Sequence, residues 1–389
     1  MEQKTIFSNV SWRFIQGFLQ FLSMILIVRN MEIADYGWYV SAISAFEVMV
    51  IFCLPGTIRI ALRSVLSNNS RFGNLLGLRL ILLPLLMFGF LLMPHQLAIL
   101  FFVATIADQI SMFARVKLNQ KKKYLMFNIL ESIKPFLLIV FVILHIFTFD
   151  ELISIEYIAI IYCFVSVLVM ILNILFSKKY AYLSLMVSLP EKKDLLDSIY
   201  ASGNGLIGIF IRRGAVLVAA ITFSTTDAAY VNIGLQFLTI FTMLYSGLSL
   251  SMTRDIYDKS ISFMEIKDIY LNPLFFLTSI IIFSSIVLYF YGDVLLVFFF
   301  GVDAVGASEI IYLTPLILLF QLPQLIIMGL FMRLEKEQLI LFMNCFSILF
   351  FLPILVIFSN NLQTLIIILL IFVFFTSLLY LLTFSKLKF

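Results

Sequence analysis

The sequence FSNVSWRFIQGFLQFLSMILIVRN, residues 7–30, is long and apolar enough to cross a membrane as one helix, yet it carries regularly spaced polar side chains. These side chains, separated by four, three, four and three residues, are Asn9, Arg13, Gln16, Gln20 and Ser23. Such spacing places them on one face of an α-helix. The stretch therefore predicts a membrane-spanning helix with one wet or protein-packed face and a remainder that contacts lipid.

The composition of the whole chain extends this prediction to a polytopic membrane protein. Of the 389 residues, 62% are hydrophobic and only 12% are charged, and the mean hydropathy is +1.11. Apolar runs of about 20 residues match a helix that crosses a ~30 Å hydrocarbon core. We therefore predict an all-α integral membrane protein of about 12 transmembrane helices, near residues 8–29, 38–60, 75–93, 96–115, 126–147, 156–176, 199–221, 228–252, 272–291, 306–331, 338–358 and 362–384.

Charges in the connections alternate between the two sides of the predicted membrane. Basic residues such as Arg63, Lys178 and Arg333 fall on the side of Lys4, whereas the opposite loops are acidic. The positive-inside rule then places both termini in the cytoplasm. Every outer loop is short and no nucleotide-binding glycine motif is present, so we predict that the protein is not an enzyme.

An internal repeat supports two similar halves. A shift of 191 residues aligns Tyr39-Val40 with Tyr230-Val231, Phe46 with Phe237, Gly56 with Gly247 and Arg63 with Arg254. Parallel repeats of this kind are related by an axis along the membrane normal. We predict two pseudo-symmetric six-helix lobes, residues 1–180 and 199–389, joined by a cytoplasmic linker at residues 181–198, with chance identity between apolar helices as the alternative.

Polar stripes recur on two further predicted helices. They comprise Asn232, Gln236, Thr239, Met243 and Ser246 on one helix, and Thr105, Asp108, Met112 and Arg115 on the other. Stripes on several helices indicate a shared interior that holds water. Asn, Gln and Thr in membrane helices also simply hydrogen-bond to neighbouring helices, for about 0.6 kcal/mol a pair, and the sequence leaves both interpretations open for these residues.

Charged residues deep in the predicted spans carry a stronger functional signal, because a charge at the centre of a membrane helix costs about 2.5 to 3.5 kcal/mol. Arg212 and Arg213 lie near the middle of one span, Glu47 near the middle of another and Asp108 well inside a third. Adjacent residues on a helix project in different directions. We therefore expect one of the two arginines to face a cavity and the other to pair with Glu47 or Asp108.

The remaining intramembrane charges have simpler explanations. Arg59 and Arg79 lie within about two turns of the cytoplasmic edge and can reach it, and Arg13 is slightly deeper. Glu131 and Lys134, three residues apart on one span, are predicted to neutralise each other. The resulting interior is basic and increasingly so toward the cytoplasm, which favours an anionic substrate. Arginine suits phosphate in particular, because its planar guanidinium donates two parallel hydrogen bonds.

The cysteines indicate neither a disulfide nor a metal site. Cys53, Cys163 and Cys345 all fall inside apolar runs and are predicted to be buried thiols. No metal site and no cofactor are predicted.

Residues near the N-terminus resemble those of a known family. The recurring features are Asn9 and Trp12 in the first helix, the turn Asp35-Tyr36-Gly37 after it, and Gly56 before the basic Arg63. They resemble the opening of Wzx-type polysaccharide-repeat flippases of the multidrug/oligosaccharidyl-lipid/polysaccharide (MOP) exporter superfamily. The local motif covers about the first 65 residues, while the length and the number of spans fit over the whole chain.

This resemblance implies two MATE-like lobes around a cavity. It also implies alternating access that carries an undecaprenyl-pyrophosphate-linked oligosaccharide from the inner to the outer leaflet of a bacterial cytoplasmic (inner) membrane. The polymer would be O-antigen, capsule or exopolysaccharide. Together with the polar stripes, the resemblance suggests a substrate cavity lined by Arg13, Arg59, Arg212, Arg213, Asn9, Gln16, Gln20, Asn232 and Gln236.

The resemblance also suggests coupling and partners. Glu47 and Asp108 are candidates for coupling transport to a proton or sodium gradient, or else permanent counter-ions for arginine. The expected partners are the lipid-linked oligosaccharide, membrane lipids, a polysaccharide polymerase and a chain-length regulator, and no nucleic acid is expected. Arg13 and Arg59 occupy places comparable to pyrophosphate-binding arginines of the related lipid II flippase. The sequence departs from that protein because its two additional helices are missing and the span near 228–252 has no buried arginine.

Two other functions remain open. A membrane polysaccharide polymerase or glycosyltransferase has similar length and hydropathy, but it usually needs a large outer loop that is missing here. A MATE-like drug/cation antiporter should bind cations through cavity acids, which the basic bias opposes.

Overall fold

The computed structural model is helical in every regular element of the chain that it describes. It describes residues 2–58, 60–61, 71–93, 95–120, 123–149, 151–181, 187–257, 263–334 and 336–386. The predicted all-α class is confirmed, and it follows from the need to satisfy backbone hydrogen bonds in lipid.

The first half of the chain forms six crossings, two of which contain 3₁₀ segments. Its elements are α1 (Glu2–Arg29), α2 (Ile33–Met49), η1 (Val50–Cys53), α4 (Phe72–Leu82), η2 (Leu83–Phe88), α5 (Gly89–Leu92), α6 (Ala98–Gln120), α7 (Tyr124–Phe149) and α8 (Ile155–Ala181). Since α2 begins at Ile33, the motif Asp35-Tyr36-Gly37 forms the first turn of this helix. The prediction of a separate turn there is wrong.

The second half also consists of helices, two of which are 33 and 38 residues long. Its elements are α9 (Lys192–Ile209), η3 (Phe210–Gly214), α10 (Ala215–Thr222), α11 (Thr225–Tyr257), α12 (Phe263–Phe300), η4 (Val302–Ala307), α13 (Ser308–Ile311), α14 (Thr314–Arg333), α15 (Glu337–Phe358) and α16 (Leu362–Ser385). Helix α9 starts seven residues before the predicted span at 199, inside the segment expected to be a linker.

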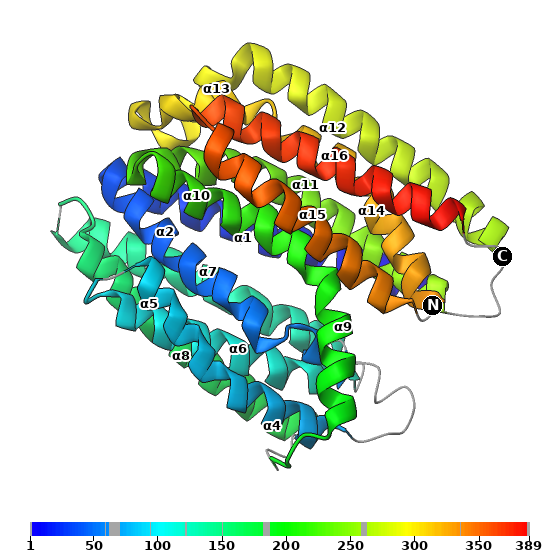
Figure 1. Ribbon diagram of the computed structural model, residues 1–389. Coiled ribbons are helices and arrows are strands. Elements are labelled where there is room, and N and C mark those ends of the chain that lie inside the picture. The colour runs from blue at the N-terminus through cyan, green and yellow to red at the C-terminus, as the bar shows by residue number, and fades with distance from the viewer. Residues whose placement is uncertain are drawn as a thin grey trace.

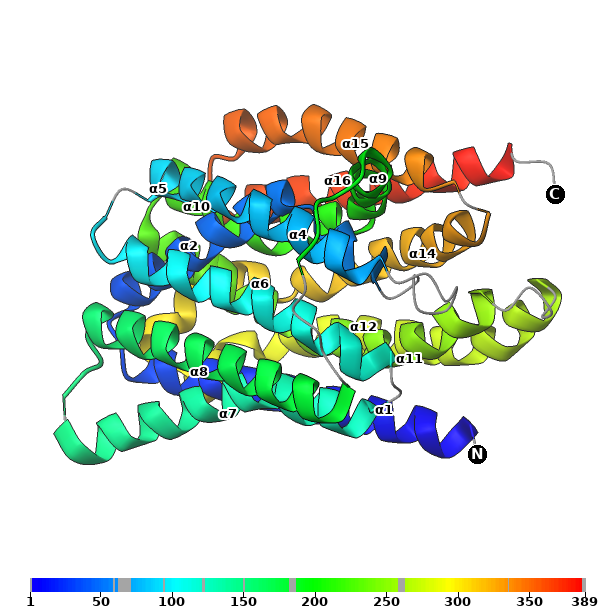
Figure 2. The ribbon, with the colours of Figure 1, turned by 90° about the horizontal axis from the view of Figure 1, so that it is seen from below.

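The crossings agree with the sequence prediction. Among the described residues, 11 helices are long and apolar enough to span a membrane. The remaining predicted span, near residues 228–252, falls within α11, which is 33 residues long. Both termini lie at the same end of the bundle (Figure 1; Figure 2). We call this end the basic end, and the opposite end, where Asp35, Asp227 and Asp303 lie, the acidic end.

The two halves form two groups of helices. Figure 1 shows α2 and α4–α8 on one side and α12–α16 on the other, with α1, α10 and α11 between them. Helix α1 packs against α7 and α11, and α2 also packs against α11. The main seam between the halves therefore runs along α1, α2 and α11.

Apolar packing differs between the two ends of this seam. The largest buried cluster joins both halves and includes Val28 of α1, Phe46 of α2, Val231 of α11 and Phe300 of α12, mostly in the acidic half of the bundle. Toward the basic end, smaller clusters such as those around Leu118 in the first half and around Tyr380 in the second half stay within one half. At the basic end a further cluster joins Ile60 and Phe72 of the first half to Ala201 in the second half. The halves thus share their largest core near the acidic end and meet at the basic end through the segment around Ala201.

Candidate functional site

Arg212 and Arg213 lie in a π-helical turn, η3, between α9 and α10. Such turns contain one extra residue and occur frequently at functional sites. Arg213 points toward α2, where its Nε and Nη2 atoms donate to the Glu47 carboxylate at 2.6 and 3.0 Å. This bidentate pair joins the two halves of the chain. The prediction that one of the arginines pairs with Glu47 or Asp108 is confirmed for Arg213 and Glu47.

Arg212 forms no ion pair within the described part of the chain, and its Nε donates to the Gly208 carbonyl at 3.3 Å. The side chain is exposed although protein surrounds it on most sides, as expected for a group in a concave space. Gly205 and Gly208 lie on the same helix face. A Cβ atom at Gly205 would meet nothing within 4 Å, and one at Gly208 would meet only Arg212. Two glycines therefore leave open space beside a free guanidinium.

A second ion pair lies within the first half. Lys134 of α7 donates to Asp108 of α6 at 2.6 Å, and its Nζ atom lies 4.0 Å from the centre of the Tyr162 ring, a cation–π contact. Tyr162 is within electrostatic range of Asp108, Glu47 and Arg213, so the two ion pairs are neighbours. The acid that neutralises Lys134 comes from another helix.

A third group lies nearer the basic end. Arg13 of α1 contacts Glu131 of α7 at 2.8 Å, and Arg115 of α6 lies 4.0 Å from the other oxygen of the same carboxylate. Arg13 also donates to the Gln16 side chain at 3.1 Å. The prediction that Glu131 and Lys134 neutralise each other is therefore wrong, because each finds a partner on a different helix.

Together these side chains form a row of charges that we call the charge ladder. It contains five cations and three carboxylates, a net charge of +2, and its paired members keep 12 to 38% of their side-chain surface exposed. The row is thus accessible and basic, as the sequence predicts. Its members are Arg13, Arg115, Glu131, Lys134, Asp108, Arg213, Glu47 and Arg212.

The other residues predicted to line the cavity differ in their exposure. Gln20 is exposed and Gln236 is half-buried. The side chain of Asn9, and the whole of Arg59, lie outside the described part of the structure. No role of these residues in substrate binding is tested by the structure.

Asn232 lies in a helix contact at the acidic end. It is 4% exposed, and its Nδ2 atom donates to the Tyr36 hydroxyl at 2.6 Å. Close by, Gly37 of α2 packs against the backbone of Thr225 at the start of α11. The sequence left open whether Asn232 faces a hydrated interior or hydrogen-bonds to a neighbouring helix. The structure shows the hydrogen bond to a neighbouring helix. These contacts close the seam at the acidic end.

Arg79 does not reach the basic edge, and the prediction that it does is wrong. Its side chain is 2% exposed and donates to the Thr57 hydroxyl at 2.7 Å and to the Leu54 carbonyl at 3.5 Å, and it also bonds to Gln109. Leu54 has φ +51° and interrupts the second crossing. The guanidinium is therefore a cap for the carbonyl groups freed at this break.

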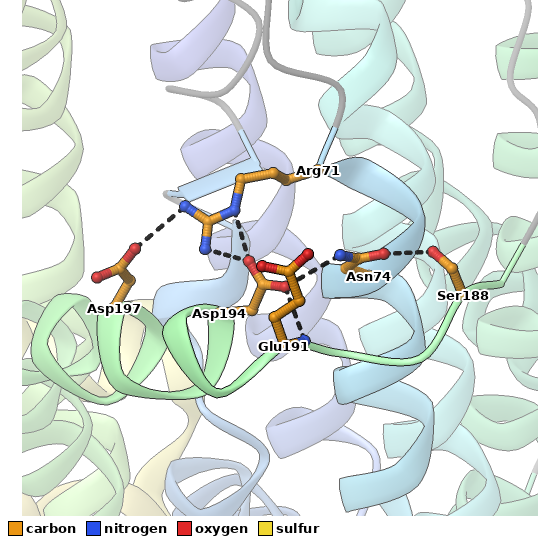
Figure 3. Close-up of polar contacts among 6 residues, drawn as sticks. All are labelled: Arg71, Asn74, Ser188, Glu191, Asp194 and Asp197. Carbon is orange, nitrogen blue, oxygen red and sulfur yellow. Dashed lines mark hydrogen bonds and ion pairs between the residues drawn. The ribbon is translucent and has the colours of Figure 1, made fainter.

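A polar joint fixes α9 to α4 at the basic end (Figure 3). The fully buried Asp194 carboxylate accepts from Arg71 Nε at 2.5 Å, from Asn74 at 3.1 Å and from the backbone of Glu191 at 3.0 Å. Arg71 also donates to Asp197 at 3.1 Å. Burial alone would lower the pKa of Arg71, but hydrogen bonds and attraction from the two aspartates raise it. The first turns of α9, in the second half, are thus tied to the first half.

Two further hydrogen bonds extend this joint. The Gly56 amide donates to the Ser202 hydroxyl of α9 at 2.9 Å, and Asn344 of α15 donates to the Gly203 carbonyl at 2.7 Å. Helix α9 therefore bonds to both halves. The joint could not be predicted from the sequence, because Asp194 and Asp197 lie in a segment that resembles an ordinary charged linker.

The fold is shared with solved transporters. A structure titled as the inward-facing conformation of a multidrug resistance MATE family transporter of the MOP superfamily matches with a TM-score of 0.64 and 13% identity, over 95% of this chain and 93% of that one. The D35N mutant of the Vibrio cholerae MATE transporter VcmN matches with a TM-score of 0.66 and 15% identity, over 98% of this chain and 96% of that one. A MATE structure in the straight conformation gives 0.62 and 14%, over 98% and 94%.

No protein-family model matches the sequence, and no curated protein matches it. At these identities the structural likeness shows the fold, which is that of MATE family transporters of the MOP superfamily. Which ligand the protein binds must be argued from the chemistry of the charge ladder.

Proposed function

We propose that this protein is a flippase for lipid-linked oligosaccharides whose head group carries a diphosphate. The observation that carries the proposal is the free, accessible guanidinium of Arg212 beside the Arg213–Glu47 pair. A phosphate group supplies the anion that this guanidinium lacks, and the +2 charge of the ladder attracts it.

The distribution of apolar cores supports uptake from the basic end, which the positive-inside rule predicts to be cytoplasmic. The resemblance of the N-terminal residues implies that the membrane is a bacterial inner membrane. The largest core shared by the two halves lies near the acidic end, whereas near the basic end the clusters around Leu118 and Tyr380 each stay within one half and α9 joins the halves. The diphosphate would move along the ladder while the sugars stay in the hydrated interior and the polyprenyl tail stays in lipid. Rocking of the halves would then open the acidic end. A polysaccharide polymerase and a chain-length regulator are the partners expected downstream.

The ion pairs favour a counter-ion role for both cavity acids. Glu47 is occupied by Arg213 and Asp108 by Lys134. A carboxylate that is already paired with a cation is not free to bind a sodium ion. Their amide variants test this role, because gradient dependence of transport should stay unchanged.

The proposal is tested by Arg212→Gln, with Arg212→Lys and Gly205→Ala as matched variants. In a strain that depends on this gene for surface polysaccharide, Arg212→Gln should reduce the polymer at least about tenfold, the equivalent of one charge-assisted hydrogen bond. Arg212→Lys should keep part of the activity, and Gly205→Ala most of it. Full polymer with Arg212→Gln, at normal protein abundance in the membrane, would refute the assignment.

A drug/cation antiporter is the second candidate, because the matched structures include multidrug transporters of the same fold. It requires a cavity carboxylate that is free to bind a cation. In the described part of the ladder all three carboxylates are paired with Arg or Lys. Efflux of organic cations that is lost in Glu47→Gln but retained in Arg212→Gln would support this candidate and contradict the flippase.

A further inference from the structure

One carboxylate serves two arginines near the basic end of the ladder. The two oxygens of Glu131 face Arg13 at 2.8 Å and Arg115 at 4.0 Å. Both guanidinium groups also lie 5.8 Å from the centre of the Phe127 ring. The two guanidinium groups therefore share one carboxylate and one aromatic ring, and the three charged groups come from the three helices α1, α6 and α7.

The group has an excess of charge and of hydrogen-bond donors. A guanidinium has five N–H donors and keeps its charge at any ordinary pH, so two arginines around one carboxylate carry a net charge of +1. At 4.0 Å, Arg115 attracts the carboxylate without a hydrogen bond to it. Its Nε atom is buried and has no hydrogen-bond partner among the described residues. Arg115 is therefore the less satisfied of the two arginines.

The group also remains accessible. The side chains of Arg13, Arg115 and Glu131 keep 24, 12 and 18% of their surface exposed. A ligand can thus reach the arginines without unfolding a helix contact. A diphosphate carries more negative charge and more acceptor oxygens than a carboxylate, so it can satisfy both guanidinium groups together.

We infer that Arg13 and Arg115 form an uptake site for the diphosphate group of the substrate, and that Glu131 is a resident competitor occupying this site between transport cycles. The inference rests on the proposed function and adds to it a named second arginine and a carboxylate that opposes binding. When the diphosphate arrives, it displaces Glu131 from the arginines. When it moves on toward Arg212, Glu131 returns and prevents rebinding.

The competitor role of Glu131 predicts that removal of this carboxylate strengthens the binding of diphosphate. A carboxylate that only supports the site would weaken ligand binding when it is removed. A competitor has the opposite effect, because its removal leaves both arginines free for the ligand. Glu131→Gln should therefore bind diphosphate more tightly and, since release is slowed, transport less.

The test uses the purified full-length chain in lipid nanodiscs, with radiolabelled farnesyl diphosphate as the probe and farnesol as a competitor that lacks the charge. Glu131→Gln should raise the affinity about fivefold, which corresponds to the upper end of the range for removing a partly exposed competing ion pair. Arg115→Gln should lower the affinity by a similar factor. Asp197→Asn, which removes a carboxylate that contacts an arginine outside the bundle interior, is the matched control and should change nothing.

The possible outcomes separate the inference from the function on which it rests. If the wild-type protein binds the probe and Glu131→Gln binds equally or less tightly, the inference is refuted while the flippase proposal stands. If neither protein binds farnesyl diphosphate, both are refuted. Displacement of the probe by farnesol at equal concentration would also refute the inference, because binding would then depend on the chain and not on the diphosphate.

Discussion

The ion pair between Glu47 and Arg213 should be energetically coupled, and the adjacent Arg212 provides an internal control. Glu47→Gln replaces one of the two oxygens that accept hydrogen bonds of 2.6 and 3.0 Å by an NH2 group, and it leaves the Arg213 charge without its counter-ion, beside a second arginine. Breaking a fully buried pair costs about 3 to 5 kcal/mol, whereas an exposed pair contributes about 0.2 to 1 kcal/mol. Since the side chains here are 23 and 38% exposed, we expect a cost of about 2 kcal/mol in the free energy of unfolding.

A double-mutant cycle measures this coupling directly. Reversible unfolding in mixed detergent and SDS micelles would be followed for Glu47→Gln, Arg213→Gln and the double variant. We expect the double variant to be more stable than the sum of the single changes predicts, by about 1 kcal/mol or more. The same cycle with Arg212→Gln should show almost no coupling. If Glu47 couples equally to both arginines, the pairing seen in the structure does not decide the energetics and the reasoning is wrong.

Two further predictions concern the ends of the bundle. Asp194→Asn should lower the free energy of unfolding by about 2 to 3 kcal/mol, because a fully buried acceptor loses its charge, while Asp197→Asn, 38% exposed, should cost less than about 1 kcal/mol in the same assay. Gly37→Ala would overlap the Thr225 carbonyl and should prevent closure of the acidic end, whereas Gly205→Ala meets open space. The assay is the labelling, from the acidic side, of cysteines introduced along the seam. Labelling should increase in Gly37→Ala and stay unchanged in Gly205→Ala. Equal labelling of the two variants would contradict this account of the closure.

Parts of the candidate site could be predicted from the sequence. Deep charges are rare in membrane helices because they are costly, so Arg212, Arg213, Glu47 and Asp108 could be selected without coordinates. The difference in direction between adjacent residues predicted that only one of the two arginines pairs with an acid, and the structure shows that Arg213 is the paired one. The roles of these residues in binding remain predictions.

Other parts could not be predicted, because the sequence shows which residues share a face but not what lies opposite that face. Glu131 and Lys134 are correctly spaced to meet on one helix, yet their partners are Arg13 and Asp108 on two other helices. Arg79 is close enough to the membrane edge to reach water, yet it is buried against the broken second crossing.

By itself, the sequence determined that this protein is surrounded by lipid and consists of membrane-spanning helices. Lipid requires every backbone group to be bonded within the chain, so long apolar runs must become helices, and the basic connections orient them. Only the tertiary structure decided which charges neutralise one another and which guanidinium stays free. That choice depends on the packing of helices far apart in the sequence, where a difference of a few ångströms separates an ion pair such as Arg213–Glu47 from an unpaired neighbour such as Arg212.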